Sequence, residues 1–201
     1  PCRPRAGGPE PRPPALPPFP PVNHTMNNPD WNPWLDAYFQ RFRPAFDPAV
    51  HENLVRFHDL AVQVRESRRK LIFAGNGASA SISSHGAVDF TKQAKVRAVD
   101  FNEPNLITAF SNDYGYEHWV ARAMACYADD GDVAVLISVS GTSPNIVNAA
   151  KYAKERGMKI VTFSGKQADN PLRALGDINF WIGSAAYNVV EAVHMLWMTT
   201  V

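Results

Sequence analysis

The feature that most constrains the fold is a short apolar run that ends in a hydroxyl-rich turn and leads directly into a helix signal. Residues 133–137 are apolar, and the segment SVSGTS and then Pro144 follow them. An apolar run bounded by turn residues is typical of a buried strand. Ser143 suits the start of a helix because its hydroxyl can cap free N–H groups, and Pro144 gives up only an N–H that would be unpaired there. The stretch therefore predicts a strand, a turn and a helix N-terminus.

A turn of this kind offers a phosphate free backbone N–H groups, hydroxyl donors and the positive end of a helix dipole. It contains no lysine, so it is not the nucleotide-binding GxxxxGK loop. The alternative is an ordinary capped turn between a strand and a helix. A second unit of the same kind, residues 71–74 followed by GNGAS, favours phosphate binding. Two such turns can line one crevice at the carboxyl ends of a parallel sheet, where open α/β folds bind ligands.

The chain from residue 70 onward alternates strand and helix patterns, which predicts βαβ units, a parallel sheet and right-handed crossovers. The predicted strands are residues 70–74, 96–99, 133–137, 159–163 and 178–181. The predicted helices are residues 80–90, 116–128, 144–155, 172–175 and 188 to the end. Residues 106–110 are ambiguous. The last helix is still apolar at Val201 and has no C-cap signal, so we expect the chain to be cut within it.

The N-terminal segment differs in kind from the rest of the chain. Residues 1–25 hold ten of the 17 prolines. Such a segment cannot bury enough apolar surface to offset the entropy of ordering it. We expect a disordered arm there, or translated sequence upstream of a start at Met26. A polyproline ligand for another domain is the alternative.

Residues 26–201 are expected to form a single domain, in which N-terminal helices at residues 31–69 precede the α/β core. Trp34, Tyr38 and Phe42 lie at helical spacing in this region. An aromatic stripe of this sort is typical of packing, either on the chain's own sheet or on another subunit.

Composition excludes several classes of protein. The 201 residues are 45% hydrophobic, which is enough for one sizeable core. A net charge of +1 with both signs scattered gives no electrostatic reason to expect nucleic acid or an anionic membrane as partner. Cys2 and Cys126 form neither a disulfide framework nor a metal-ligand spacing, which favours a reducing, cytoplasmic setting. No run is apolar enough to span a bilayer, and no signal peptide is recognisable.

Three segments together resemble the sugar isomerase (SIS) domain family, and within it the phosphoheptose isomerase branch. They are GNGAS at residues 75–79, SNDYGY at 111–116 and LISVSGTS at 136–143. The resemblance covers about residues 31–201. It implies a three-layer αβα sandwich around a five-stranded parallel, doubly wound sheet, with helix-mediated homotetramers and active sites between subunits. The residues that it implies for phosphate and sugar binding are Asn76, Gly77, Ser79, Asp113, Ser138, Ser140 and Ser143.

The family also places a histidine and a glutamate on the helix after the first loop, and a glutamine and a histidine on the C-terminal helix. These four residues bind a metal, commonly zinc, and some of them serve as acid and base. The first pair matches His85 and Asp89, which lie at i and i+4. The second pair falls on Val190 and Met198, and neither is a zinc ligand.

An aldose–ketose isomerisation removes a proton beside a carbonyl and returns it to the neighbouring carbon, which requires a base and a group that stabilises the enediolate. Asp89 is the candidate base, and His85 or His194 is the candidate acid or metal ligand. Glu191 and His194 could replace the missing zinc ligands, although we expect weak zinc binding or none. The alternatives are a structural helix pair for His85 and Asp89, and a core or interface histidine for His194.

Two functions follow from these observations. The first is an isomerase acting on sedoheptulose 7-phosphate or a related ketose phosphate, for surface-polysaccharide precursors. The second is a non-catalytic SIS module that binds a sugar phosphate and regulates a protein partner. The phosphate loops fit both functions, the missing metal ligands favour the module, and His85 with Asp89 favours the enzyme, which is our choice.

Overall fold

The computed structural model describes residues 16–18 and 30–201, and it separates into a unit that ends at Arg43 and a unit of residues 44–201. The first unit contains α1 (Asn32–Gln40). Along this helix the ring of Tyr38 stacks on that of Trp34, with 5.4 Å between the ring centroids. The aromatic stripe therefore packs ring against ring within its own unit.

Two predictions about the organisation of the chain are not tested by the structure. The disordered arm predicted over residues 1–25 lies outside the described residues, apart from residues 16–18. The single domain predicted over residues 26–201 stays a prediction.

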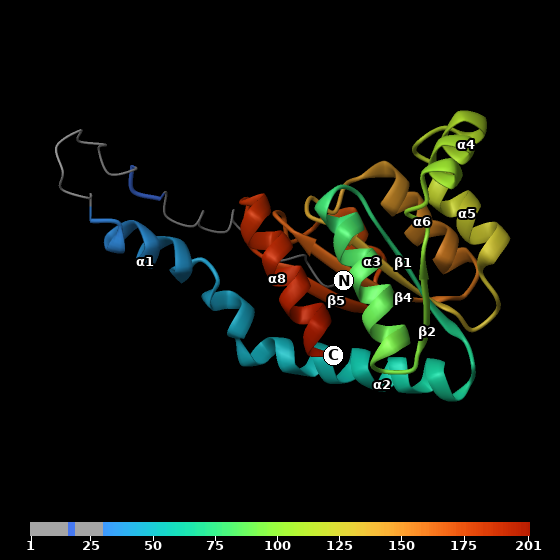
Figure 1. Ribbon diagram of the computed structural model, residues 1–201, viewed down its shortest axis with the longest axis horizontal. Coiled ribbons are helices and arrows are strands. Elements are labelled where there is room, and N and C mark those ends of the chain that lie inside the picture. Colours follow the sequence, from blue (N-terminus) through green and yellow to red (C-terminus); the bar gives the residue numbers. More distant parts are fainter. Residues whose placement is uncertain (1–15, 19–29) are drawn as a thin grey trace, which may run out of the picture. The chain divides into compact units, whose positions relative to one another are not determined.

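A parallel sheet with the strand order β2-β1-β3-β4-β5 forms the centre of the second unit (Figure 1). Its strands are β1 (Lys70–Gly75), β2 (Arg97–Asp100), β3 (Val133–Ser138), β4 (Lys159–Gly165) and β5 (Ile178–Ile182). β1 and β3 are buried along their whole length, as expected for parallel strands that helices cover on both faces. The predicted five-stranded parallel sheet is confirmed, and each predicted strand lies within two residues of the observed bounds.

Helices cover both faces of the sheet, which confirms the predicted αβα sandwich (Figure 1). On one face lie α2 (His51–Glu66), α3 (Ala78–Lys92) and α8 (Tyr187–Thr200). On the other lie α6 (Pro144–Glu155), α7 (Pro171–Leu175) and α5 (Trp119–Tyr127), with α4 (Pro104–Tyr114) packed on α5. The short 3-10 helices η1 (Arg43–Phe46) and η2 (Pro48–Val50) precede α2. No helix in the described part of the chain has the length and apolar character needed to cross a membrane.

The two faces of the sheet are packed with different side chains. The face toward α5 and α6 is filled mainly by aliphatic residues and alanines, among them Ile72 and Leu136. The opposite face is aromatic, and the rings of Phe163 and Phe180 stack with 4.6 Å between their centroids. Trp197 of α8 is 2% exposed there, and its Nε1 donates to the carbonyl of Ala45 at 2.9 Å. Both faces of the central strands β1 and β3 are therefore buried, whereas the edge strand β2 is partly exposed.

The segment that the sequence left ambiguous, residues 106–110, lies inside α4. The Glu103 carboxylate accepts a hydrogen bond from the Leu106 N–H at 2.8 Å and so caps the helix, and Pro104 occupies its first turn. Gly115 ends α4 with a φ of +84°, a value that glycine adopts without strain. This turn delays the next helix, so α5 begins at Trp119 rather than at the predicted residue 116.

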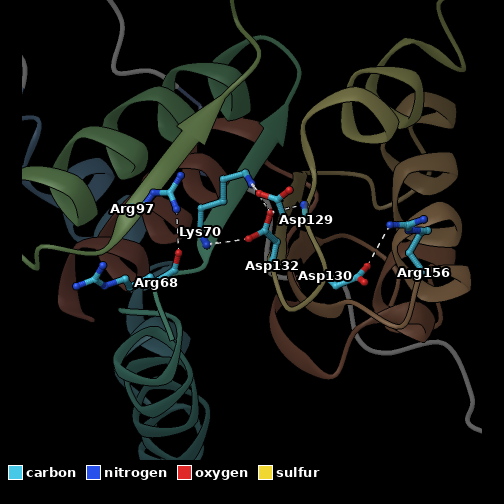
Figure 2. Close-up of polar contacts among 7 residues, drawn as sticks. All are labelled: Arg68, Lys70, Arg97, Asp129, Asp130, Asp132 and Arg156. Atoms are coloured by element: carbon cyan, nitrogen blue, oxygen red, sulfur yellow. Dashed lines mark hydrogen bonds and ion pairs between the residues drawn. The ribbon is translucent and has the colours of Figure 1, made fainter. Parts of the chain in front are cut away.

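Charged residues close the amino end of the sheet (Figure 2). Lys70 begins β1, and its ammonium lies 2.7 Å from Asp129 and 2.6 Å from Asp132. Asp132 is 1% exposed and also accepts the backbone N–H of Lys70 at 2.9 Å and of Asp129 at 2.8 Å. Burial alone would lower the pKa of Lys70, but hydrogen bonds and charges from the two aspartates outweigh it and raise the pKa. We call Lys70, Asp129 and Asp132 the amino-end cluster.

Candidate functional site

A cavity of about 110 Å³ lies at the opposite end of the sheet, where β1 and β3 finish beside the first turns of α8. We call it the carboxyl-end cavity. The predicted binding residues that line it are Asn76, Ser79, Ser138, Ser140 and Ser143. Two separate strand–turn–helix units therefore contribute to one cavity, as the parallel sheet requires of loops at the ends of neighbouring strands.

The turn between β3 and α6 holds its hydroxyls close together. The Oγ atoms of Ser138 and Ser143 are 3.0 Å apart, and Ser140 accepts the Thr142 N–H at 3.2 Å. Ser143 occupies the N-cap of the twelve-residue α6, but its hydroxyl pairs with Ser138 and makes no capping bond, contrary to the prediction. The first turn of α6 therefore presents N–H groups and the positive end of the helix dipole. The turn also bends at Gly141, where φ is +65° and the side chain of Asn170 occupies the space a Cβ would need. Only glycine fits this position.

The turn between β1 and α3 is equally tight. A Cβ on Gly75 would lie 2.5 Å from the carbonyl oxygen of Ser79, so the chain can fold back on itself only with glycine there. Gly77 immediately precedes α3 with a φ of +57° and does not line the cavity. Its role is to turn the backbone so that Asn76 and Ser79 both face the cavity.

Asn76 is held by two residues that we did not predict. Its amide exchanges two hydrogen bonds with the amide of Asn145, at 2.9 and 2.8 Å. The hydroxyl of Tyr116 donates to the same Asn76 oxygen at 3.1 Å. Asn145 lies on α6 and is 1% exposed, so this reciprocal pair ties the first turn of α6 to the loop after β1.

The wall of the cavity contributed by α8 carries Tyr187 and Glu191, one helical turn apart. Lys166, at the end of β4, places its ammonium 3.0 Å from the Tyr187 hydroxyl and 4.3 Å from the centre of its ring. Tyr187 was not predicted, and Glu191 was predicted only as a possible metal ligand. The i, i+4 spacing of the two residues is the signal that could have identified this wall.

Val190 and Met198, the positions matched to the family's second pair of metal ligands, face the core instead of the cavity. They are 0% and 2% exposed. Val190 packs where Gly165 leaves room, and Met198 packs where Gly86 does. Glu191, the next residue after Val190, lines the cavity. Neighbouring positions on α8 therefore face the core and the site respectively.

His85 and Asp89 form an ion pair with 3.1 Å between Nε2 and Oδ2, on a part of α3 that does not line the cavity. Their side chains are 54% and 37% exposed. A helix rises about 1.5 Å per residue, so His85 lies roughly 9 Å further along α3 than Ser79. The candidate acid–base pair and Ser79 are therefore separated along one helix.

His194 lies in the core. It is 0% exposed, and its Nε2 donates to the Ser164 carbonyl at 3.1 Å. Burial lowers its pKa from 6.5 to about 4, although the bond to Ser164 acts in the opposite direction. Its Nδ1 has no hydrogen-bond partner among the described residues. Asp113, the remaining predicted sugar-binding residue, lies on α4, does not line the cavity and accepts a hydrogen bond from Asn112.

The described residues do not fit a zinc ion. Zinc in proteins takes three or four histidine, cysteine or carboxylate ligands. In residues 16–18 and 30–201, no three such side chains come together in an arrangement that could hold a metal. His85 and Asp89 are a pair without a third ligand, so no step of the chemistry is assigned to a metal.

The cavity has the size and lining for a phosphate group. A cavity of about 110 Å³ has room for a phosphate. Serine hydroxyls and a helix N-terminus suit an anion that only accepts hydrogen bonds.

Comparison with known proteins identifies the family of this chain. The SIS domain matches residues 37–165. Phosphoheptose isomerase from Aliarcobacter butzleri is 29% identical over 158 residues, which cover 76% of this chain and 83% of the relative. The enzyme of that name from Helicobacter pylori strain P12 is 30% identical over 154 residues, covering 74% and 80%.

A solved structure shares the fold. The phosphoheptose isomerase from Neisseria gonorrhoeae superposes with a TM-score of 0.74 at 27% identity, covering 82% of this chain and 93% of that one. The three sequence segments, the parallel sheet and the serine-lined cavity all agree with these similarities. The chain belongs to the SIS domain family, and within it to the phosphoheptose isomerase branch.

Proposed function

We propose that the protein is an aldose–ketose isomerase that acts on a sugar phosphate, with sedoheptulose 7-phosphate as the substrate to test first. The observation that carries the proposal is the carboxyl-end cavity, in which four serines from two loops meet at the N-terminus of α6. Its relatives bear the name phosphoheptose isomerase. A phosphate bound in this cavity would anchor one end of the sugar.

The separation along α3 suits a substrate with its phosphate and its carbonyl at opposite ends. With the phosphate among Ser138, Ser140 and Ser143, the carbon chain runs along α3 toward His85 and Asp89. Asp89 takes a proton from C1 of the ketose and returns it to C2. His85 gives a proton to the oxygen on C2 and takes one from the oxygen on C1, so that the aldose forms with all protons accounted for.

The test of this proposal is turnover. The purified protein is incubated with sedoheptulose 7-phosphate, and the aldose product is measured. Asp89→Asn should lower kcat by roughly 100- to 10,000-fold, the usual contribution of a general base, and leave phosphate affinity unchanged. Asp59→Asn is the matched control, because the Asp59 side chain is exposed on α2. A variant with unaltered kcat would remove Asp89 from the reaction.

A second function is favoured by a specific observation, namely that no three metal-ligating side chains come together in the described chain. A module that binds a sugar phosphate and regulates a protein partner needs the serine cavity and no catalytic metal. Binding of sedoheptulose 7-phosphate without any turnover would favour this module over the enzyme.

We also propose that the protein assembles into a homotetramer. Large apolar side chains are exposed on neighbouring elements of one layer: Phe46 of η1 is 67% exposed, Val55 of α2 58% and Val88 of α3 57%. Burial of such side chains against a second copy stabilises association. Sedimentation at micromolar concentration tests the proposal, and a clean monomer would contradict it. The free thiol of Cys126 suits a reducing cytoplasm, where we propose the protein acts.

A further inference from the structure

We propose that Asn145 and Tyr116 are positioning residues, which fix the side-chain amide of Asn76 so that it presents only an N–H to the ligand in the carboxyl-end cavity. The inference rests on the proposed binding of a phosphorylated ligand there. It concerns how the site selects an anion, and it holds for the enzyme and for the binding module alike.

The hydrogen bonds of Asn76 account for all of its groups except one. Its Oδ1 has two lone pairs. One accepts from Asn145 Nδ2 at 2.8 Å, and the other accepts from the Tyr116 hydroxyl at 3.1 Å. Of the two N–H groups on Nδ2, one donates to Asn145 Oδ1 at 2.9 Å. The remaining N–H belongs to a side chain that lines the cavity.

Burial is what makes this orientation stable. Asn145 is 1% exposed, so its amide can exchange its partners neither with water nor with other groups without a cost. A buried amide that loses its hydrogen bonds costs about 1–3 kcal/mol. Reversal of Asn76 alone would place oxygen against oxygen and nitrogen against nitrogen in the pair. Asn76 is therefore not free to turn over, as an unrestrained asparagine would be.

The consequence is that Asn76 joins the serines as a donor to an anion, in a lining that also includes the Glu191 carboxylate. A phosphate accepts hydrogen bonds from serine hydroxyls, from N–H groups of α6 and from Asn76 Nδ2. A reversed Asn76 would instead direct a carbonyl oxygen at the negative charge. Asn145 and Tyr116 contact Asn76 and act on the ligand through it, so neither was predicted as a binding residue, although Tyr116 ends the segment SNDYGY.

The experiment measures the affinity for inorganic phosphate and for sedoheptulose 7-phosphate by calorimetry. Asn145→Ala should weaken both by about tenfold, because a hydrogen bond from a fixed donor to a charged acceptor is lost. Tyr116→Phe should weaken them by about threefold, since one lone pair of Asn76 is released. Asn148→Ala is the matched control. Asn148 also lies on α6 and donates to the carbonyl of Glu117 at 2.9 Å, but it does not touch Asn76.

A double-mutant cycle separates positioning from a general structural effect. In an Asn76→Ala background, Asn145→Ala should have almost no further effect on phosphate affinity, because the residue through which it acts is gone. An undiminished tenfold loss in that background would overturn the proposal, as would unchanged affinity in both Asn145→Ala and Tyr116→Phe. If Asn145→Ala does not fold, the same cycle is carried out with Tyr116→Phe, whose side chain is 53% exposed.

The two proposals fail in different ways. Phosphate binding without turnover would overturn the proposed isomerase activity. The double-mutant cycle would still test the positioning of Asn76, because it measures phosphate affinity alone. Failure of the unaltered protein to bind either phosphate compound would overturn the positioning of Asn76 toward an anion as well.

Discussion

The two ends of the same sheet deal with polar groups in opposite ways. At the amino end, Lys70, Asp129 and Asp132 satisfy one another, and Asp132 also bonds two backbone N–H groups. At the carboxyl end, serines and Asn76 surround a cavity. The comparison teaches that a closed polar cluster stabilises the fold, whereas a cluster that leaves donors toward a cavity is available to a ligand.

Breaking the amino-end cluster should give the largest effect. Asp132→Ala leaves the Lys70 ammonium and two backbone N–H groups without a buried partner. Loss of one member of a buried ion pair costs about 3–5 kcal/mol of the free energy of unfolding. Urea unfolding measures it. Asp130→Ala is the control, because Asp130 is 90% exposed in its pair with Arg156, and we expect no measurable change. Equal stability of the two variants would refute the importance of the cluster.

The second largest effect is expected from acid, which should lower the free energy of unfolding through the buried His194 of α8. The folded-state pKa of His194 is about 4, below its ordinary 6.5, so the unfolded chain takes up the proton first as pH falls. Its contribution to stability is present above about pH 6.5 and is lost as pH falls toward about 4. The loss amounts to roughly 3 kcal/mol at about 1.4 kcal/mol per pKa unit.

Urea unfolding at a series of pH values tests this expectation. His194→Gln should flatten the dependence between pH 6.5 and 4, and exposed His58→Gln should not. Asp129 responds only at lower pH, because its hydrogen bond and ion pair with Lys70 hold its pKa below 3.8. An unchanged profile in His194→Gln would show that burial of this ring does not control acid stability.

Removing hydroxyls from the cavity should affect binding without affecting the fold. Ser140→Ala and Ser143→Ala should each weaken sugar-phosphate binding by about 1–3 kcal/mol, the range for a hydrogen bond to a charged group. Calorimetry gives the affinities, and urea unfolding should remain near that of the unaltered protein. Ser67→Ala, which lies at the end of α2 far along the chain from these loops, serves as a control. Unchanged affinity would remove the β3–α6 turn from the binding site.

The smallest effect is expected from removal of metal. The described chain brings no three metal ligands together, so chelation should alter neither phosphate affinity nor unfolding. Elemental analysis after purification without chelators should find little zinc. Stoichiometric zinc that disappears in His85→Ala would contradict this expectation and assign α3 a role in metal binding.

Local signals made most of the fold predictable. The apolar run before SVSGTS placed β3 to within one residue. Ser143 at the end of that segment, followed by Pro144, placed the start of α6. α4 was harder to predict, because its apolar segment is short and its cap, Glu103, is not one of the usual capping residues. In the cavity, the serines were predictable since their loops carry recognisable residues, whereas Asn145 acts through a partner 69 positions away.

The orientation of α8 shows where sequence reasoning ended. This helix is apolar around most of its circumference, so no stripe indicates which side faces the sheet. Val190 and Met198 were matched to ligand positions, but packing against Gly165 and Gly86 turns them inward. The i, i+4 spacing of Tyr187 and Glu191 places them on one side of α8, and the folded structure shows that this side forms the cavity wall.

The distance along α3 between Ser79 and His85 has a consequence for inhibition. In the proposed mechanism, a ligand whose phosphate lies beside Ser79 must be long enough to bring its carbonyl to His85, roughly 9 Å further along the helix. Three-carbon sugar phosphates should therefore occupy the cavity as competitive inhibitors without being converted, and inorganic phosphate should act in the same manner. Selectivity would then come from chain length, because all these compounds share the phosphate.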